Sequence, residues 1–224
     1  MKLSEFLHDE MAGLRFLLSL PPQKASETHP VLCFLHGLGE GAPADVHEGV
    51  TRHGPLSPGA PALVRQKFIV VAPQLPIRGD NWRFYDRAVR TIVGEIQARH
   101  MGDPRRTYLT GFSFGGNGVF DLALQHPAPW RALWPVDPTR LPEKDPGLPV
   151  WFSSGEISRH HSAGFIERLR LRPLEGNQGD RVYVDEGLDH VGTATSAYRN
   201  DRIYEWLLVP RAVNQSSNSG SFQP

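Results

Sequence analysis

The chain has 224 residues, with 24 Lys and Arg residues against 24 Asp and Glu residues. Its formal net charge is therefore zero, which gives no reason to expect nucleic acid or an anionic membrane surface as a partner. With 39% hydrophobic and 21% charged residues, the composition is that of a soluble globular protein. The one cysteine, Cys33, excludes an intrachain disulfide and any zinc site built on several thiolates.

The apolar stretch near the start of the sequence is the place to look for a targeting signal or a membrane segment. The apolar stretch "LRFLLSLPP" is broken by Arg15 and stopped by Pro21, so it is a poor secretory signal and too short to span a bilayer. We expect a cytoplasmic protein without a membrane segment. We expect residues 1–210 to form one domain, and the polar, low-complexity residues 211–224 to be a flexible tail.

Short apolar runs alternate with helical patterns along the domain. Near-continuous apolar runs are typical of strands buried on both faces of a parallel sheet, and we predict seven of them, at 14–20, 31–37, 67–74, 106–112, 131–136, 148–155 and 180–187. Helical patterns occupy residues 82–100, 116–126, 162–171 and 201–208. The alternation predicts an α/β fold with a mostly parallel, doubly wound sheet flanked by helices.

The stretch "YLTGFSFGGN" places Ser113 in a strand-to-helix turn. Gly111-Phe-Ser-Phe-Gly115 fits the pattern G-x-S-x-G, with an apolar strand before it and a helix after it. The glycines let strand and helix approach closely, so the serine hydroxyl stands exposed at the carboxyl end of the sheet. We predict that Ser113 is a nucleophile and that the amide of Phe114 donates to an oxyanion.

A second candidate element is the loop "HGLGE" after the strand "VLCFL". An oxyanion hole needs a second backbone N–H from the loop after an earlier strand, and the amide of Leu38 is the candidate. We interpret His36 as a brace that holds the loop through hydrogen bonds, and Glu40 as structural.

The general base must follow the serine in this kind of hydrolase. His126 is most simply the C-cap of a helix, and His160 and His161 begin or precede another helix. His190 follows the last predicted strand in a loop that can reach the serine at the carboxyl edge of the sheet. We therefore predict His190 as the base.

The acid that orients the histidine has two candidates. Asp137 follows the strand 131–136, and Glu156 follows the strand 148–155; both strand ends point to the same edge of the sheet. Asp189 adjoins His190, and adjacent side chains rarely face one another well. We favour Asp137 over Glu156, and a Ser-His pair without an acid is a third possibility.

Taken together, these motifs resemble those of small α/β-hydrolase esterases related to polyhydroxybutyrate depolymerases, dienelactone hydrolases and phospholipase/carboxylesterases. The matching pieces run in order over most of the chain: "FLHGLGEGA", "RHGPLSPG", "KFIVVAPQLP", "RRTYLTGFSFGGNGVFDLALQHP", "LPVWFSSGE" and "DHVGTATSAYRNDRIYEWLL". The resemblance implies oxyanion donation near Leu38, a nucleophile at Ser113 and a base at His190. It also implies an aspartate where this chain has Ser158, and a histidine where it has Ser154, so the usual acid is missing.

The connection "DPTRLPEKDPG" is too short to hold a cap domain, which predicts an open, shallow site for small or extended acyl groups. Trp82 and Phe112 are candidates to line the acyl side, and Phe114 to narrow it. We expect a small-molecule ester as substrate and no metal or organic cofactor. The competing hypothesis, motivated by the missing aspartate, is a weakly active or non-hydrolytic protein with a binding, lyase or cyclase role.

Overall fold

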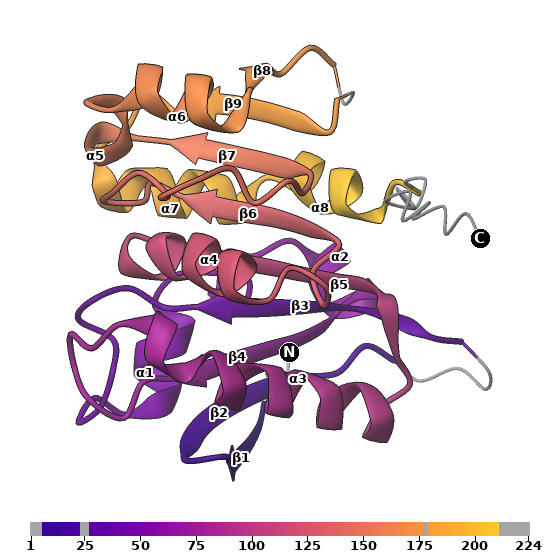
Figure 1. The fold of residues 1–224 in the computed structure, drawn as a ribbon. Coiled ribbons are helices and arrows are strands. Elements are labelled where there is room, and N and C mark those ends of the chain that lie inside the picture. The colour runs from indigo at the N-terminus through magenta and orange to yellow at the C-terminus, as the bar shows by residue number, and fades with distance from the viewer. Residues whose placement is uncertain (1–5, 23–26, 177–178, 211–224) are drawn as a thin grey trace, which may run out of the picture.

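A computed structural model describes residues 6–22, 27–176 and 179–210 of the chain. They form a nine-stranded sheet in the order β1-β2-β4-β3-β5-β6-β7-β9-β8 (Figure 1). β1 pairs with β2, and β2 with β4, in antiparallel fashion, and all other pairs are parallel. The strands are β1 (Leu7–Met11), β2 (Leu14–Ser19), β3 (His29–Leu35), β4 (Ile69–Gln74), β5 (Gly102–Phe112), β6 (Ala132–Val136), β7 (Val150–Ser154), β8 (Arg172–Pro173) and β9 (Arg181–Asp185).

Helices cover both faces of this sheet. One face packs against α3 (Asp86–Arg99), α4 (Phe114–Gln125) and α6 (Ser162–Leu169). The other face packs against α1 (Val46–Thr51), α2 (Ala62–Lys67), α7 (His190–Arg199) and α8 (Asp201–Leu208). The 3-10 helix η1 (Trp82–Tyr85) precedes α3, and the short α5 (Glu156–Arg159) follows β7. The predicted doubly wound sheet is therefore confirmed.

The central strands are apolar at every position because each face of the sheet is covered. Val31, Cys33 and Leu35 of β3 belong to the core under α3 and α4. Leu32 and Phe34, which point the other way, belong to the core under α7 and α8. All five side chains are fully buried. This explains why the sequence shows continuous apolar runs instead of an alternating pattern.

All seven predicted strands are present, as β2, β3, β4, β5, β6, β7 and β9. The additional strand β1 is mostly exposed and reads "LHDEM", so no apolar run marks it. β8 has only two residues. The helices α1, α2 and α5 are only four to six residues long, too short for a periodic pattern. These elements were absent from the sequence prediction for those reasons.

The prediction was wrong about the surroundings of His190. It placed this histidine in a loop followed by one final helix. In the structure His190 is the first residue of α7, and α8 follows as a separate helix. Asp189 is the N-cap of α7, and its side chain accepts a hydrogen bond of 2.7 Å from the amide of Gly192. The histidine is thus held at a capped helix start instead of in a free loop.

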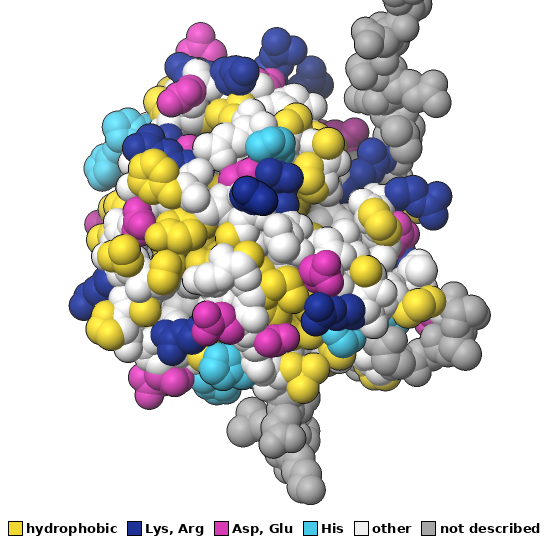
Figure 2. Space-filling view, turned by 60° about the horizontal axis from the view of Figure 1, so that its bottom comes forward, with side chains coloured by type: hydrophobic (Ala, Val, Ile, Leu, Met, Phe, Trp, Pro, Cys, Tyr) yellow, Lys and Arg dark blue, Asp and Glu magenta, His cyan; other side chains and the backbone are white. Residues whose placement is uncertain are grey.

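Residues 137–149 connect β6 to β7 without a helix or strand, so no cap domain enters at this point. In the view of Figure 2, basic and acidic side chains are interspersed with apolar ones rather than gathered by sign. None of the helices in the described part of the chain has the length and apolar character needed to cross a bilayer.

Candidate active site

Ser113 occupies a sharp turn between β5 and α4, at the carboxyl edge of the sheet. Its backbone has φ 57° and ψ −115°, a left-handed conformation that is strained for a residue with a side chain. Its amide donates a hydrogen bond of 2.9 Å to the carbonyl oxygen of Val136 on β6. A Cβ atom at Gly111 would overlap the carbonyl oxygen of Gly115, and one at Gly115 would overlap that of Leu35. Both glycines are therefore required by the close approach of strand and helix.

His190 lies directly beside Ser113. Its Nε2 atom is 2.9 Å from Oγ of Ser113, and its Nδ1 atom is 2.6 Å from Oδ2 of Asp137. A carboxylate can only accept, so Nδ1 carries the hydrogen in the neutral ring and Nε2 is left with a lone pair. The serine hydroxyl therefore donates to Nε2, the arrangement in which a histidine can remove the serine proton.

Asp137 lies at the end of β6 and is fully buried. Its backbone has φ 40°, and its amide donates to the carbonyl oxygen of Ser153 over 2.8 Å. Oδ1 accepts hydrogen bonds from the amides of Gly155 (3.0 Å) and Ser158 (2.8 Å) and from the Ser158 hydroxyl (2.7 Å). Ile157 is farther away, with its amide 3.4 Å from Oδ2. The start of α5 thus surrounds the carboxylate with donors.

These donors decide the charge of Asp137. Burial alone would raise its pKa, but the hydrogen bonds from His190 and from the amide and hydroxyl of Ser158 outweigh it and hold the pKa below the ordinary value. Asp137 is therefore a carboxylate at neutral pH. Glu156, the alternative acid, is exposed at the start of α5, and among the described residues no hydrogen bond joins it to His190. Sequence reasoning noted Ser158 only as a departure from the family pattern and gave it no role.

The loop after β3 is braced by His36. Its Nε2 atom accepts a hydrogen bond of 2.9 Å from the amide of Leu75, so Nδ1 carries the hydrogen and donates to the carbonyl oxygen of Gly37 over 2.7 Å. Burial lowers the pKa of His36 to about 4, which keeps the ring neutral. The carboxylate of Glu40 accepts a hydrogen bond of 2.7 Å from the Gly37 amide. Both side chains thus fix the loop, as interpreted from the sequence.

The two predicted oxyanion donors belong to the loop after β3 and to the start of α4. Leu38 follows Gly37 in the braced loop, and its side chain is 48% exposed. A Cβ atom at Gly37 would lie 3.6 Å from the carbonyl oxygen of Phe112, so the loop touches the residue before Ser113. Phe114 is the first residue of α4, where a backbone N–H has no acceptor within the helix. Both positions suit donation to a developing oxyanion.

The aromatic residues differ from the sequence expectation. Trp82 is only 2% exposed; it packs against Gly118 of α4, and its Nε1–H donates to the carbonyl oxygen of His36 over 3.1 Å. Phe112 is 5% exposed, and its ring lies 4.6 Å from that of His190. Both side chains therefore expose little surface, and they pack against His36 of the loop and against the ring of His190. Phe114 is partly exposed, and its predicted contact with an acyl group stays a prediction.

His53 joins the same cluster from the other side of Phe112. Its ring lies 5.0 Å from the Phe112 ring, and its Nε2 atom is 3.6 Å from Oε1 of Glu40. Burial, with the positive charge of Arg52 and the neighbouring ring of His190, lowers the pKa of His53 to about 4. His53 is therefore a neutral packing partner at pH 7, consistent with its structural interpretation.

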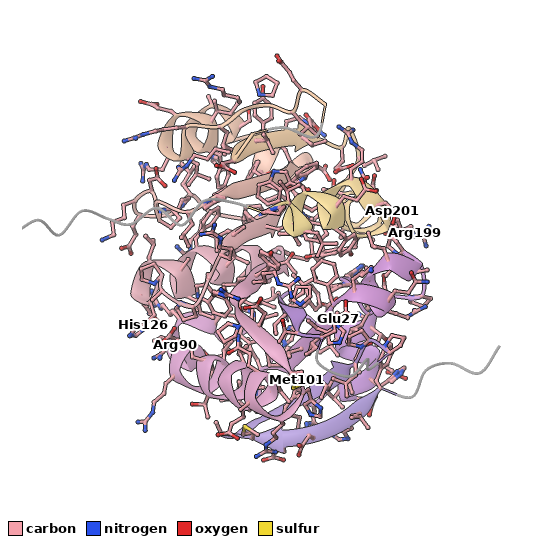
Figure 3. All side chains as sticks on the ribbon, turned by 90° about the vertical axis from the view of Figure 1, so that its right-hand side faces the viewer. Glu27, Arg90, Met101, His126, Arg199 and Asp201 are labelled. Atoms are coloured by element: carbon pink, nitrogen blue, oxygen red, sulfur yellow. The ribbon has the colours of Figure 1, made fainter. Side chains whose placement is uncertain are left out.

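The remaining histidines after Ser113 have other surroundings. His126 is the C-cap of α4, as predicted, and its Nδ1 atom is 2.8 Å from Oδ2 of Asp86. Arg90 pairs with the same aspartate, and Figure 3 shows Arg90 and His126 side by side. His160 and His161 are exposed between α5 and α6. Among the described residues, none of these three histidines has a hydrogen bond to Ser113.

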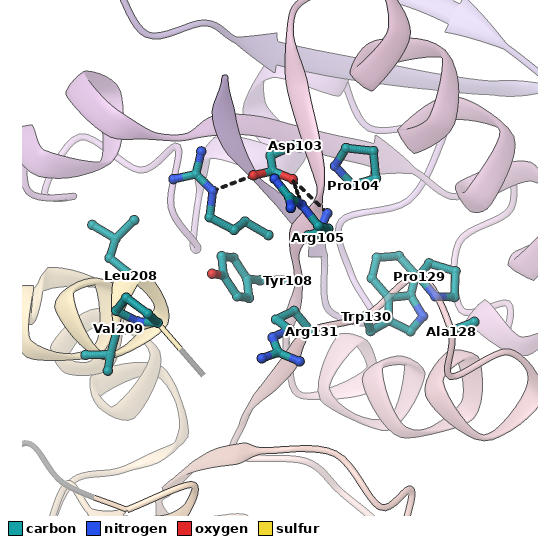
Figure 4. Close-up of a pocket in the computed structure, with 12 residues that line it drawn as sticks. Asp103, Pro104, Arg105, Tyr108, Ala128, Pro129, Trp130, Arg131, Leu208 and Val209 are labelled. Carbon is teal, nitrogen blue, oxygen red and sulfur yellow. Dashed lines mark hydrogen bonds and ion pairs between the residues drawn. The ribbon is translucent and has the colours of Figure 1, made fainter. Parts of the chain in front are cut away.

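A cavity away from Ser113 lies at the opposite edge of the sheet. It has a volume of about 640 Å³ and is lined by Arg105, Arg106 and Arg131 together with Trp130 (Figure 4). These residues lie near the amino ends of β5 and β6, so the cavity opens at the edge of the sheet opposite Ser113. Within the described residues, no group of three or more His, Cys, Asp or Glu side chains is arranged to hold a metal ion.

No protein-family model matches the chain. A curated relative, S-formylglutathione hydrolase from Mus musculus, is 26% identical over 202 residues, which are 79% of this chain and 70% of the relative. The family expected from the sequence motifs is thus supported by a relative that is itself a hydrolase.

Solved structures share the fold. A thermostable esterase matches with a TM-score of 0.69 and 22% identity over 90% of this chain, which spans only 62% of that esterase. S-formylglutathione hydrolase from Staphylococcus aureus matches with a TM-score of 0.65 and 13% identity, covering 90% of this chain and 95% of the other. These matches confirm the predicted α/β-hydrolase fold.

Proposed function

We propose that this chain is a serine hydrolase of carboxylic esters, with Ser113 as nucleophile, His190 as general base and Asp137 as the acid that orients the base. The observation that carries the proposal is the unbroken hydrogen-bond chain from Ser113 Oγ through His190 to Asp137. It stands at the carboxyl edge of the sheet, beside a loop (Leu38) and a helix start (Phe114) that are suited to oxyanion donation. Hydrolysis of esters is also the chemistry to which the similar proteins point.

In the acylation step, His190 Nε2 takes the proton from Ser113 Oγ as this oxygen attacks the ester carbonyl carbon. The carbonyl oxygen becomes an oxyanion, which the amides of Leu38 and Phe114 stabilise. The protonated His190 is stabilised by the carboxylate of Asp137. It then gives its proton to the leaving alcohol oxygen as the carbon–oxygen bond breaks, which leaves an acyl-enzyme on Ser113.

In the deacylation step, His190 takes a proton from a water molecule that attacks the acyl carbon. The second oxyanion collapses, the acid is released, and the proton returns from His190 to Ser113. Throughout the cycle Asp137 stays ionised, because its four close donors stabilise the charged form. Its role is to hold the ring in one tautomer and to stabilise the imidazolium.

The substrate side of the proposal is an open site that accepts small or extended acyl groups. It is supported by the short connection between β6 and β7, residues 137–149, which leaves no room for a cap. The name of the mouse relative supports adding S-formylglutathione to the substrates tested. The competing non-hydrolytic role was motivated by a missing acid, and the contact between Asp137 and His190 supports the hydrolase in its place.

The proposal is tested by assaying p-nitrophenyl acetate and S-formylglutathione with the wild type, Ser113→Ala and a control, Ser162→Ala, which changes the serine that opens α6. We expect turnover by the wild type and the control and loss of turnover in Ser113→Ala. Equal turnover by all three proteins would contradict a role of Ser113 as nucleophile.

A further inference from the structure

Ser158 is a fully buried residue beside the proposed triad, and the catalytic steps above use its hydroxyl only as one of the donors that keep Asp137 ionised. It is the third residue of α5, a helix that starts where β7 ends. Two atoms of Ser158 contact the same carboxylate oxygen: the amide lies 2.8 Å and the hydroxyl 2.7 Å from Oδ1 of Asp137. The hydroxyl bond is as short as a charge-assisted hydrogen bond.

The direction of the Ser158 hydroxyl is set by its other neighbours. The amide of Gly155 points at Ser158 Oγ from 3.2 Å, and Oγ of Ser154 lies 3.3 Å away. An amide can only donate, so it uses an acceptor site of the Ser158 oxygen. The hydroxyl has one hydrogen, and the carboxylate is both the nearer and the charged acceptor. The hydrogen is therefore directed at Asp137, and Oγ of Ser154 is the more distant, uncharged acceptor.

The two carboxylate oxygens of Asp137 have different hydrogen-bond partners. Oδ1 receives three donors from the start of α5, at 2.7 to 3.0 Å. Oδ2 receives His190 at 2.6 Å and otherwise only the longer contact with Ile157. A carboxylate can rotate about its own axis unless its oxygens are held. The donors on Oδ1 thus determine where Oδ2 points.

We propose that Ser158 is a positioning residue for the catalytic acid: its hydroxyl holds Oδ1 of Asp137 so that Oδ2 faces Nδ1 of His190. The inference rests on the proposed Ser113-His190-Asp137 triad. Ser158 touches neither the substrate nor the serine, and it acts through Asp137. Its removal therefore affects the rate of the chemical steps and leaves ester binding unchanged.

The test compares Ser158→Ala with Ser154→Ala, which removes a buried hydroxyl of the same size from the same cluster without touching Asp137. For p-nitrophenyl acetate we expect Ser158→Ala to lower kcat about tenfold at unchanged KM, a usual effect of one lost charge-assisted hydrogen bond. We expect Ser154→Ala to change kcat less than about twofold. Unchanged kcat in Ser158→Ala would overturn the inference.

A double-mutant cycle separates positioning from a general structural effect. In the Asp137→Ala background, where no carboxylate is left to orient, Ser158→Ala should lower the rate of Ser113 modification by a fluorophosphonate no further. The same tenfold loss in that background would overturn the inference. If Ser158→Ala does not fold, Ser158→Cys, which keeps a weaker donor, takes its place and should give an intermediate loss that also disappears without Asp137.

The outcome also distinguishes this inference from the proposal on which it rests. A folded wild type that reacts with no fluorophosphonate would overturn the serine hydrolase itself. A wild type that reacts, together with additive effects of Asp137→Ala and Ser158→Ala, would overturn only the role of Ser158.

Discussion

Oδ2 of Asp137 lies 2.6 Å from Nδ1 of His190, although 53 positions of the chain separate the two residues. Strand β6 delivers the carboxylate and the start of α7 delivers the ring. Their contact leaves Nε2 facing Ser113 at 2.9 Å. The acid that we propose for this site, Asp137, therefore comes from the end of β6, and the segment after β7 supplies the donors that surround it.

The first prediction concerns the identity of the acid. Asp137→Asn replaces an acceptor by an amide that offers His190 the wrong tautomer, so we expect kcat to fall by about 10³- to 10⁴-fold. Glu156→Gln is the matched control, because Glu156 is exposed at the start of α5, and we expect its kcat to stay within about twofold of the wild type. Steady-state kinetics on p-nitrophenyl acetate decide between them. A large loss in Glu156→Gln would reverse the assignment.

The second prediction concerns the turn that carries Ser113. A Cβ atom at Gly115 would overlap backbone of β3, which cannot move without disturbing the sheet. We expect Gly115→Ala to lower the free energy of unfolding by more than about 3 kcal/mol, as for a severe core clash. Gly94 is the control, since a Cβ atom there meets nothing within 4 Å and the residue lies within α3. Gly94→Ala should raise the free energy of unfolding by about 1 kcal/mol.

Urea denaturation measures both glycine variants. A Gly115→Ala protein as stable as the wild type would show that strand and helix do not approach as closely as described.

The third prediction concerns the pH dependence of stability. Burial lowers the pKa of His36 from 6.5 to about 4, so between these pH values the unfolded chain binds a proton that the folded chain does not. The free energy of unfolding then rises with pH across this window. When the pH is lowered from 6.5 to 4, the titration of His36 alone lowers the free energy of unfolding by about 3 kcal/mol.

The measurement is the free energy of unfolding at several pH values from 4 to 7.5, for the wild type and His36→Gln. Glu40 acts in the opposite sense, because burial raises its pKa, but it is present in both proteins. We expect a smaller loss toward acid pH in the variant, although its stability at pH 7.5 is lower. Parallel curves for the two proteins would show that His36 titrates normally.

The fourth prediction concerns the oxyanion loop. Glu40→Ala leaves the buried amide of Gly37 without its acceptor, so the loop that presents Leu38 loses its orientation. We expect kcat to fall about tenfold with a smaller change in KM, since the oxyanion forms only during the reaction. Glu40→Gln keeps an acceptor oxygen at this position and should retain most of the activity. Equal losses in both variants would assign the effect to the charge of Glu40 instead of its hydrogen bond.

Local sequence patterns predicted the parts of the site that depend on neighbouring residues. The glycines around Ser113 mark the turn because their spacing reflects a contact between adjacent elements. The apolar run of β3 marks a strand covered on both faces. The choice between Asp137 and Glu156 stayed open, because it depends on which strand end meets α7, a contact between distant parts of the chain.

Other features depend on packing that no local pattern records. The sequence suggests Trp82 as a candidate substrate contact. In the structure its ring is buried against Gly118 of α4, where a Cβ atom would overlap it. In the sequence, Ser158 stands where the resembling family has an aspartate, which suggests only that the acid is missing. Its hydrogen bond to Asp137 joins residues 21 positions apart, so no local pattern indicates it. The strand β1 has no apolar pattern, because its side chains are mostly exposed. Backbone pairing with β2 at the edge of the sheet holds it in place.

The most direct test of the proposed role of Ser113 is the reaction of the folded protein with a fluorophosphonate, followed by intact-mass measurement and peptide mapping. We expect one adduct per chain, located on Ser113, and none in Ser113→Ala. A folded wild type that gains no mass, or an adduct on another residue, would contradict the claim that Ser113 is the activated nucleophile.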